Sequence, residues 1–282
     1  MARGTQTTRT QRTGARLIGA FAAVLFVAVS AGAQDAPPQD ALPKGAPAQN
    51  PGVQEPAMPA LSRFCQPGAS ALAADTALPN VAAALARGKT LRILSFGAAP
   101  GRIRARGDYS DVIESMLERG LRGIDVIMIN RGVSGELAAN AAFRMKNEVA
   151  LNEPDLVLWQ VGTNDALAYV SAEDFSTAVR DQLIWLKDHK IDVVLVGLQF
   201  ASEMQRDAHY KTIRDALRKV AAEEEVAVIR FYEAMQIVNG PTAAAPVSDE
   251  FERDEAGYNC LAQYVARAIT LGTFAKGLKK RP

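Results

Sequence analysis

From residue 91 onward, short apolar runs alternate with longer amphipathic segments, and this alternation constrains the fold more than any other feature. The five runs are rich in Val, Ile and Leu, as in strands buried on both faces, and occupy residues 91–96, 125–129, 155–161, 191–198 and 226–231. The helical segments, identified by their apolar period, occupy residues 110–119, 136–150, 172–189, 207–224 and 256–271. The pattern predicts one doubly wound α/β domain, a three-layer α/β/α arrangement around a five-stranded parallel sheet.

The first 33 residues have the three parts of a secretory signal peptide. An N-terminal region with four arginines and no acidic residue precedes an apolar run from Leu17 to Val29, and small residues follow at Ala31-Gly32-Ala33. That run is shorter than the roughly 20 residues that a membrane-spanning helix needs. The sequence therefore predicts export to the periplasm or the cell exterior, with no membrane span after cleavage. An uncleaved membrane anchor is the alternative.

Composition divides the rest of the chain into a linker, a domain and a tail. Residues 34–60 hold half of the chain's 14 prolines and predict a disordered, Pro/Ala-rich linker. The globular domain is predicted at residues 61–275 and a basic tail at 276–282. Without residues 1–33, which carry four of the 32 basic side chains and none of the 31 acidic ones, the formal charge moves from +1 to −3. This balance argues against a nucleic-acid partner.

The chain has two cysteines, Cys65 and Cys260. In an oxidising compartment, an even pair of this kind predicts one disulfide. Two free, buried thiols are the alternative.

Ligands of doubly wound sheets bind at the carboxyl ends of the strands. Short polar or glycine-rich stretches follow three of the predicted strands and precede the last helix, at residues 97–101, 130–135, 162–165 and 249–258. Their order and spacing resemble the four sequence blocks of the SGNH (GDSL-type) hydrolase superfamily, over residues 91–268. The two cysteines resemble those of a bacterial secreted branch of this superfamily. The resemblance implies a flavodoxin-like fold and ester hydrolysis without a cofactor.

In the family, a serine attacks the ester, a histidine accepts its proton, and an aspartate orients the histidine. A glycine amide and an asparagine side chain stabilise the oxyanion. By this resemblance, Gly135 and Asn164 are the oxyanion donors and Asp249 is the orienting acid. The nucleophile position holds Ala99, however, and the histidine position holds Glu252. The sequence therefore predicts a catalytically degenerate esterase that binds a ligand or partner in the old ester cleft.

No other residue is an evident replacement for the missing pair. Ser95 is expected inside the first strand, and Ser134 in a turn with a local hydrogen bond. The two histidines, His189 and His209, are expected at a helix end and on a helix surface. Asp165 is expected to cap the segment that begins at Ala166.

Three arginines follow the nucleophile position, and guanidinium groups bind carboxylates and phosphates well. An anionic, ester-like small molecule or glycan is therefore a candidate ligand for Arg102, Arg104 and Arg106. A solvated, salt-bridged loop is the simpler interpretation. No spacing of metal ligands is present, so no metal is expected.

Two other functions remain open. An active ester hydrolase with a non-standard base, Glu252, would use the retained oxyanion donors. A non-catalytic structural protein of the cell envelope would use the fold as a scaffold.

Overall fold

The computed structural model describes residues 58–63, 65–66, 76–88, 90–97, 109–200, 202–239 and 250–278. The predicted signal peptide, most of the predicted linker and the end of the basic tail lie outside these residues. No helix among the described residues has both the length and the apolar character required to cross a membrane.

A five-stranded, fully parallel sheet forms the centre of the fold, which confirms the predicted α/β class. Its order is β2-β1-β3-β4-β5. The strands are β1 (Thr90–Phe96), β2 (Asp125–Asn130), β3 (Leu156–Gln160), β4 (Asp192–Val196) and β5 (Ala227–Ile229). The chain adds β2 on one side of β1 and then β3 on the other, so the connections diverge between β1 and β3. Such a switch point is where doubly wound folds bind their ligands.

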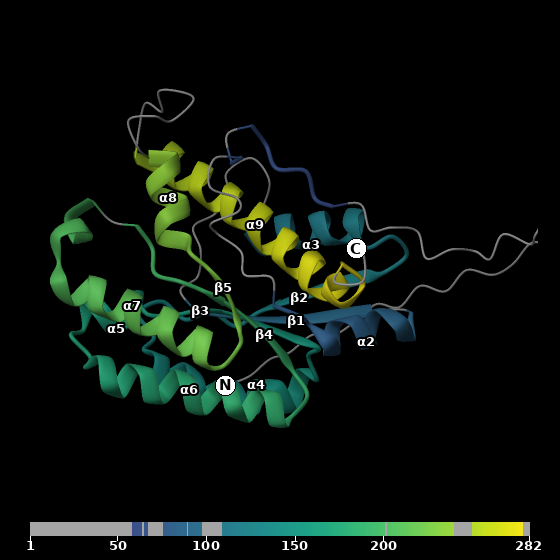
Figure 1. Cartoon of the computed structure of the whole chain (residues 1–282), viewed down its shortest axis with the longest axis horizontal. Coiled ribbons are helices and arrows are strands. Elements are labelled where there is room, and N and C mark those ends of the chain that lie inside the picture. Colours follow the sequence, from purple (N-terminus) through teal and green to yellow (C-terminus); the bar gives the residue numbers. More distant parts are fainter. Residues whose placement is uncertain are drawn as a thin grey trace, which may run out of the picture. The chain divides into compact units, whose positions relative to one another are not determined.

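Helices cover both faces of the sheet (Figure 1). On one face, a core forms beneath α2 (Pro79–Arg87), α3 (Tyr109–Gly120), α8 (Phe231–Asn239) and α9 (Glu250–Leu278). On the other, a second core forms beneath α4 (Ala138–Asn152), α5 (Thr163–Leu167), α6 (Ala172–Asp188) and α7 (Ala208–Glu223). A short 3-10 helix, η1 (Ser202–Arg206), precedes α7. Alternate residues of the central strands enter opposite cores, as the side-chain alternation of a strand requires.

Two predicted strands differ from the expectation, the second in burial and the last in length. β2 is an edge strand, and most of its residues are only half-buried. Its outer edge is covered by α3, because the Glu118 and Glu114 carboxylates accept hydrogen bonds from the Val126 and Met128 backbone N–H groups at 3.4 and 3.0 Å. The predicted last strand is three residues long, and Phe231 already begins α8.

The last helix also differs from the prediction. It begins at Glu250 rather than at residue 256, so the stretch expected to precede it forms its first turns. From residue 257 to 270 almost every residue is buried, because α9 packs against α2, α3, α8 and β5. Its apolar residues therefore lie on all sides of the helix.

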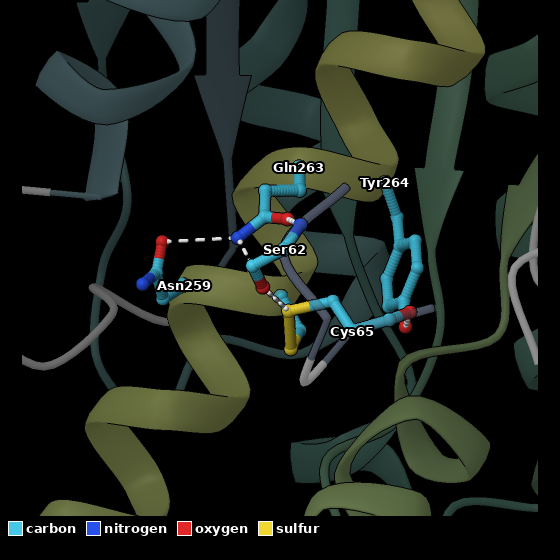
Figure 2. The surroundings of a disulfide bond; sticks show 6 residues. Ser62, Cys65, Asn259, Gln263 and Tyr264 are labelled. Carbon is cyan, nitrogen blue, oxygen red and sulfur yellow. Dashed lines mark hydrogen bonds between the residues drawn. A yellow bond between two sulfur atoms is a disulfide. The ribbon is translucent and has the colours of Figure 1, made fainter. Parts of the chain in front are cut away.

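Cys65 and Cys260 form a disulfide, as predicted from their number and the expected compartment. Figure 2 shows that the segment around Cys65 is also hydrogen-bonded to α9. The Ser62 backbone N–H donates to Gln263 Oε1 at 2.7 Å, and the Tyr264 hydroxyl donates to the Cys65 carbonyl. The disulfide and these bonds attach Ser62 and Cys65 to the middle of α9.

Candidate functional site

The ends of β3 and β4 meet α9 at the carboxyl edge of the sheet. Gln199, three residues beyond β4, donates from Nε2 to the Tyr258 hydroxyl at 2.8 Å. Its backbone N–H donates to Thr163 Oγ1, in the first residue of α5, at 3.0 Å. The Tyr210 hydroxyl donates to the Gln199 carbonyl at 2.6 Å, and burial raises the pKa of Tyr210 to about 12. This edge therefore carries neutral polar groups held in place by one another.

β1 and β3 approach each other closely where the first sequence block begins. Gly97 directly follows β1 and has a φ of +119°, in the left-handed region that favours glycine. A Cβ at this position would lie 2.2 Å from the Gln160 carbonyl oxygen, at the end of β3. Glycine is thus required here by both backbone conformation and space.

The two predicted oxyanion donors lie close together. Asn164 Nδ2 donates to the carbonyl oxygen of Glu136 at 3.0 Å, and Glu136 directly follows Gly135. Gly135 has a φ of +78° and an exposed backbone in the turn after β2. A primary amide has two N–H donors, so Asn164 retains a second one for a ligand. The assignment of both residues as oxyanion donors stays a prediction.

An ion pair that the sequence analysis missed holds this turn. Arg144 of α4 binds Glu136 in a bidentate manner, at 2.9 Å to Oε1 and 2.8 Å to Oε2. It also donates to the Arg131 carbonyl at 2.6 Å and lies over the Phe96 ring, 4.6 Å from its centroid. The hydrogen bond to Glu136 raises the pKa of Arg144. One guanidinium thus connects the turn of Gly135 with the end of β1.

Asp165 differs from its predicted role as a cap for the segment at Ala166. It lies inside α5, is 2% exposed, and accepts a hydrogen bond from the backbone N–H of Ala138 at 2.9 Å. Ala138 is the first residue of α4, so Asp165 satisfies a donor of a neighbouring helix. Burial raises the pKa of Asp165, and hydrogen bonds led by that of Ala138 oppose this rise.

The alternative serines and histidines do not form a catalytic pair among the described residues. Ser95 is buried in β1, as predicted. Ser134 is exposed, and its hydroxyl forms no hydrogen bond with the described residues, contrary to the expected turn bond. His189 ends α6, as predicted, with its Nδ1 2.7 Å from the Trp185 carbonyl. His209 is on α7, half-buried, and stacks on Tyr169 with ring centroids 5.1 Å apart.

The remaining predicted site residues are not placed by the structure. Ala99, Asp249 and the loop arginines Arg102, Arg104 and Arg106 lie outside the described residues. Glu252 falls in the first turn of α9, but its side chain is outside the described part. Within the described ranges, no three His, Cys, Asp or Glu side chains gather where they could hold a metal ion.

Comparisons with known proteins agree with this fold. The model of the non-GDSL lipase-like family matches residues 64–274. An arylesterase from Vibrio mimicus is 24% identical over 119 residues, which are 42% of this chain and 58% of that protein. The match thus spans little more than half of the arylesterase.

Solved structures show the same fold at low sequence identity. A catalytic mutant of an acetylxylan esterase from Geobacillus stearothermophilus is 18% identical, with a TM-score of 0.53 over 64% of this chain and 94% of that chain. A lipase/acylhydrolase from Enterococcus faecalis is 22% identical, with a TM-score of 0.52 over 64% and 95%.

Proposed function

Because the chain belongs to the non-GDSL lipase-like family, we propose that it is an exported SGNH-fold protein that binds an ester-like ligand without hydrolysing it. The observation that carries the proposal is Ala99 at the nucleophile position. A methyl group has no lone pair with which to attack a carbonyl carbon. Glu252 at the histidine position has no serine hydroxyl to deprotonate, so the covalent step of the family is lost.

The retained polar groups support binding. Asn164 keeps an amide donor, and the turn of Gly135 is fixed by the Glu136–Arg144 pair. Donors arranged for a developing oxyanion also bind a ground-state carbonyl, although less strongly. The proposed ligand therefore carries an ester or a similar carbonyl group, on a small molecule or a glycan.

An active ester hydrolase is the second candidate, and the similarity to an arylesterase favours it. In that case Glu252 would activate a water molecule that attacks the ester directly. The retained donors would stabilise the oxyanion, but the rate would lack the contribution of a covalent intermediate.

An ester-hydrolysis assay on the purified protein separates the two candidates. We expect short acyl esters to be hydrolysed no faster than by the Asn164→Ala variant. Turnover comparable to that of ordinary esterases, abolished by Glu252→Gln, would refute the binding function and establish the hydrolase. Ligand binding itself is tested with non-hydrolysable ester analogues, whose affinity we expect Asn164→Ala to reduce.

A double substitution tests whether the family's catalytic geometry persists. Ala99→Ser with Glu252→His would supply a nucleophile and a base next to the orienting acid Asp249. We expect measurable esterase activity in the double variant and none in either single variant, because the three groups act as a unit. A folded double variant that is inert on a panel of short esters would contradict the proposed origin of the cleft.

A further inference from the structure

Three arginines gather beside β5, outside the site described above. Arg214 and Arg218 lie on α7, and Arg230 directly follows β5. All three line one small hollow. Gly197 and Leu198, which directly follow β4, line it as well. In Figure 1, α7 and α8 lie on opposite faces of the sheet, and β5 runs between them. The hollow is therefore at the free edge of the sheet.

Within the described ranges, the carboxylates near this cluster pair with only one of the three guanidinium groups. Arg218 contacts Glu233 and lies 3.5 Å from Asp215, which also binds Lys211 at 2.6 Å. Arg214 and Arg230 form no ion pair with the described residues. Counting Glu233, which also lines the hollow, the described residues of the cluster carry an excess of positive charge.

Some guanidinium donors in the cluster are buried without a partner. The Nε atoms of Arg214 and Arg218 have no solvent exposure and no hydrogen-bond acceptor among the described residues. Leaving such a donor unpaired is unfavourable, because burial removes its hydrogen bonds to water and nothing in the fold replaces them. The guanidinium of Arg214 stacks over the Tyr232 ring, whose centroid lies 4.1 Å from Arg214 Cζ.

We propose that Arg214, Arg218 and Arg230 form a binding site for an oxyanion, namely a phosphoryl, sulfate or carboxylate group. Guanidinium groups bind such groups through parallel, charge-assisted hydrogen bonds. Burial and the neighbouring charges of Arg214 and Arg230 lower the pKa of Arg218, and a bound anion would relieve this repulsion. The site is independent of the proposed ester-binding function.

The size of the hollow limits how the anion binds. Its free volume of about 10 Å³ accepts one oxygen atom, so the rest of the ligand stays at the surface. The site therefore fits a terminal oxyanion on a larger molecule as well as a free inorganic ion.

NMR of the arginine Nε–Hε groups tests this assignment on the full chain. Sodium phosphate, sodium sulfate and sodium acetate are titrated separately at constant ionic strength, with chloride as the balancing anion. We expect saturable shifts of the Arg214 and Arg218 resonances, and the order of affinities distinguishes phosphoryl or sulfate from carboxylate ligands. The absence of a saturable shift with all three anions would overturn the proposal.

Arg230→Gln is the informative variant, because Arg230 has no ion-pair partner in the part of the chain that the structure describes. We expect it to weaken anion binding about tenfold and to leave the melting temperature unchanged or raised. Lys219→Gln, the control, makes the same charge change on the exposed side of α7 and should alter the affinity less than twofold. Equal effects of the two variants would indicate general charge screening, and a lower melting temperature of Arg230→Gln would indicate a structural arginine. Either result overturns the proposal.

Discussion

Single residues determine the geometry of the turn that carries Gly135. Its neighbour Glu136 uses its carbonyl to accept the Asn164 amide and its carboxylate to bind Arg144. The Glu136 side chain is only 7% exposed, so it depends on this guanidinium for compensation of its charge. The position of the turn relative to Asn164 is therefore coupled to Arg144, a residue of the next helix.

Arg144→Gln should weaken both the fold and this turn. Loss of the bidentate pair leaves a poorly solvated carboxylate, and we expect the free energy of unfolding in urea to fall by about 1–3 kcal/mol. The Asn164 side-chain amide resonances should shift, because the Glu136 carbonyl is no longer held. Arg180→Gln is the control: it removes the more exposed pairs of Arg180 with Glu223 and Glu224 and should cost less than about 1 kcal/mol. Equal losses in the two variants would contradict the positioning role of Arg144.

Asp165 should give the protein a pH-dependent stability. Its pKa in the folded state is raised above the ordinary value of 3.8, so folding favours the protonated carboxyl. The stabilisation by this group is fully present below the unfolded-state pKa and is lost as the pH rises through the folded-state pKa. Asp165→Asn keeps an acceptor for the Ala138 N–H and should flatten this part of the curve of unfolding free energy against pH.

Asp165→Ala separates the hydrogen bond from the charge. It leaves the Ala138 N–H without its acceptor and should cost about 1–3 kcal/mol at every pH. If the unfolding free energy of Asp165→Asn depended on pH as that of the wild type does, another titrating group would be responsible for the pH dependence. Asp192 is the first such group to test, because burial raises its pKa as well.

At the scale of helices and strands, the sequence predicted the order of the main elements but not all of their limits. Runs of Val, Ile and Leu identify the strands because the sheet buries them, as in β3 and β4. The same pattern cannot tell an edge strand from a central one, since the difference lies in the neighbouring elements. β2 illustrates this, as its outer N–H groups are satisfied by glutamates of α3. The short elements α2, α5 and α8 were missed because their burial depends on tertiary contacts.

Gly272 in α9 is expected to be required for packing. A Cβ there would lie 2.6 Å from the Thr76 carbonyl oxygen and 2.8 Å from Leu78 Cγ, in a segment also bonded to α9 through the Leu78 N–H. Backbone cannot move aside cheaply, so Gly272→Ala should lower the free energy of unfolding by about 1–3 kcal/mol.

Gly257 of the same helix provides the matched control. Among the described residues, a Cβ at Gly257 would meet only the flexible Met235 side chain, at 3.3 Å. Alanine is the better helix former by about 1 kcal/mol, so Gly257→Ala should be neutral or stabilising. Calorimetric unfolding of both variants measures the difference. If Gly272→Ala were as stable as Gly257→Ala, this result would contradict the close contact of residues 76–78 with Gly272 of α9.

For the whole molecule, the sequence predicted a site at the carboxyl edge of the sheet but not the contacts that shape that edge. Glycines and Asn164 were recognisable because their spacing after the strands is a local property of the chain. The Glu136–Arg144 pair and the three arginines beside β5 were not, because ordinary charged residues gain their roles only when folding brings their elements together. The disulfide was predictable because the chain has only two cysteines.

The disulfide should be the largest single contribution to the stability of the whole domain. It joins residues 195 positions apart, and the chain-entropy model gives such a loop about 5 kcal/mol at most. We therefore expect Cys65→Ala with Cys260→Ala to lower the melting temperature substantially. Reductant should lower the melting temperature of the wild type but not that of the double variant.

Both cysteines are at most 1% exposed, so reduction should require opening of the segment around Cys65. Mass spectrometry after alkylation without reductant should find neither cysteine labelled in the native protein. Rapid labelling of both would show that the thiols are free and would contradict the predicted disulfide.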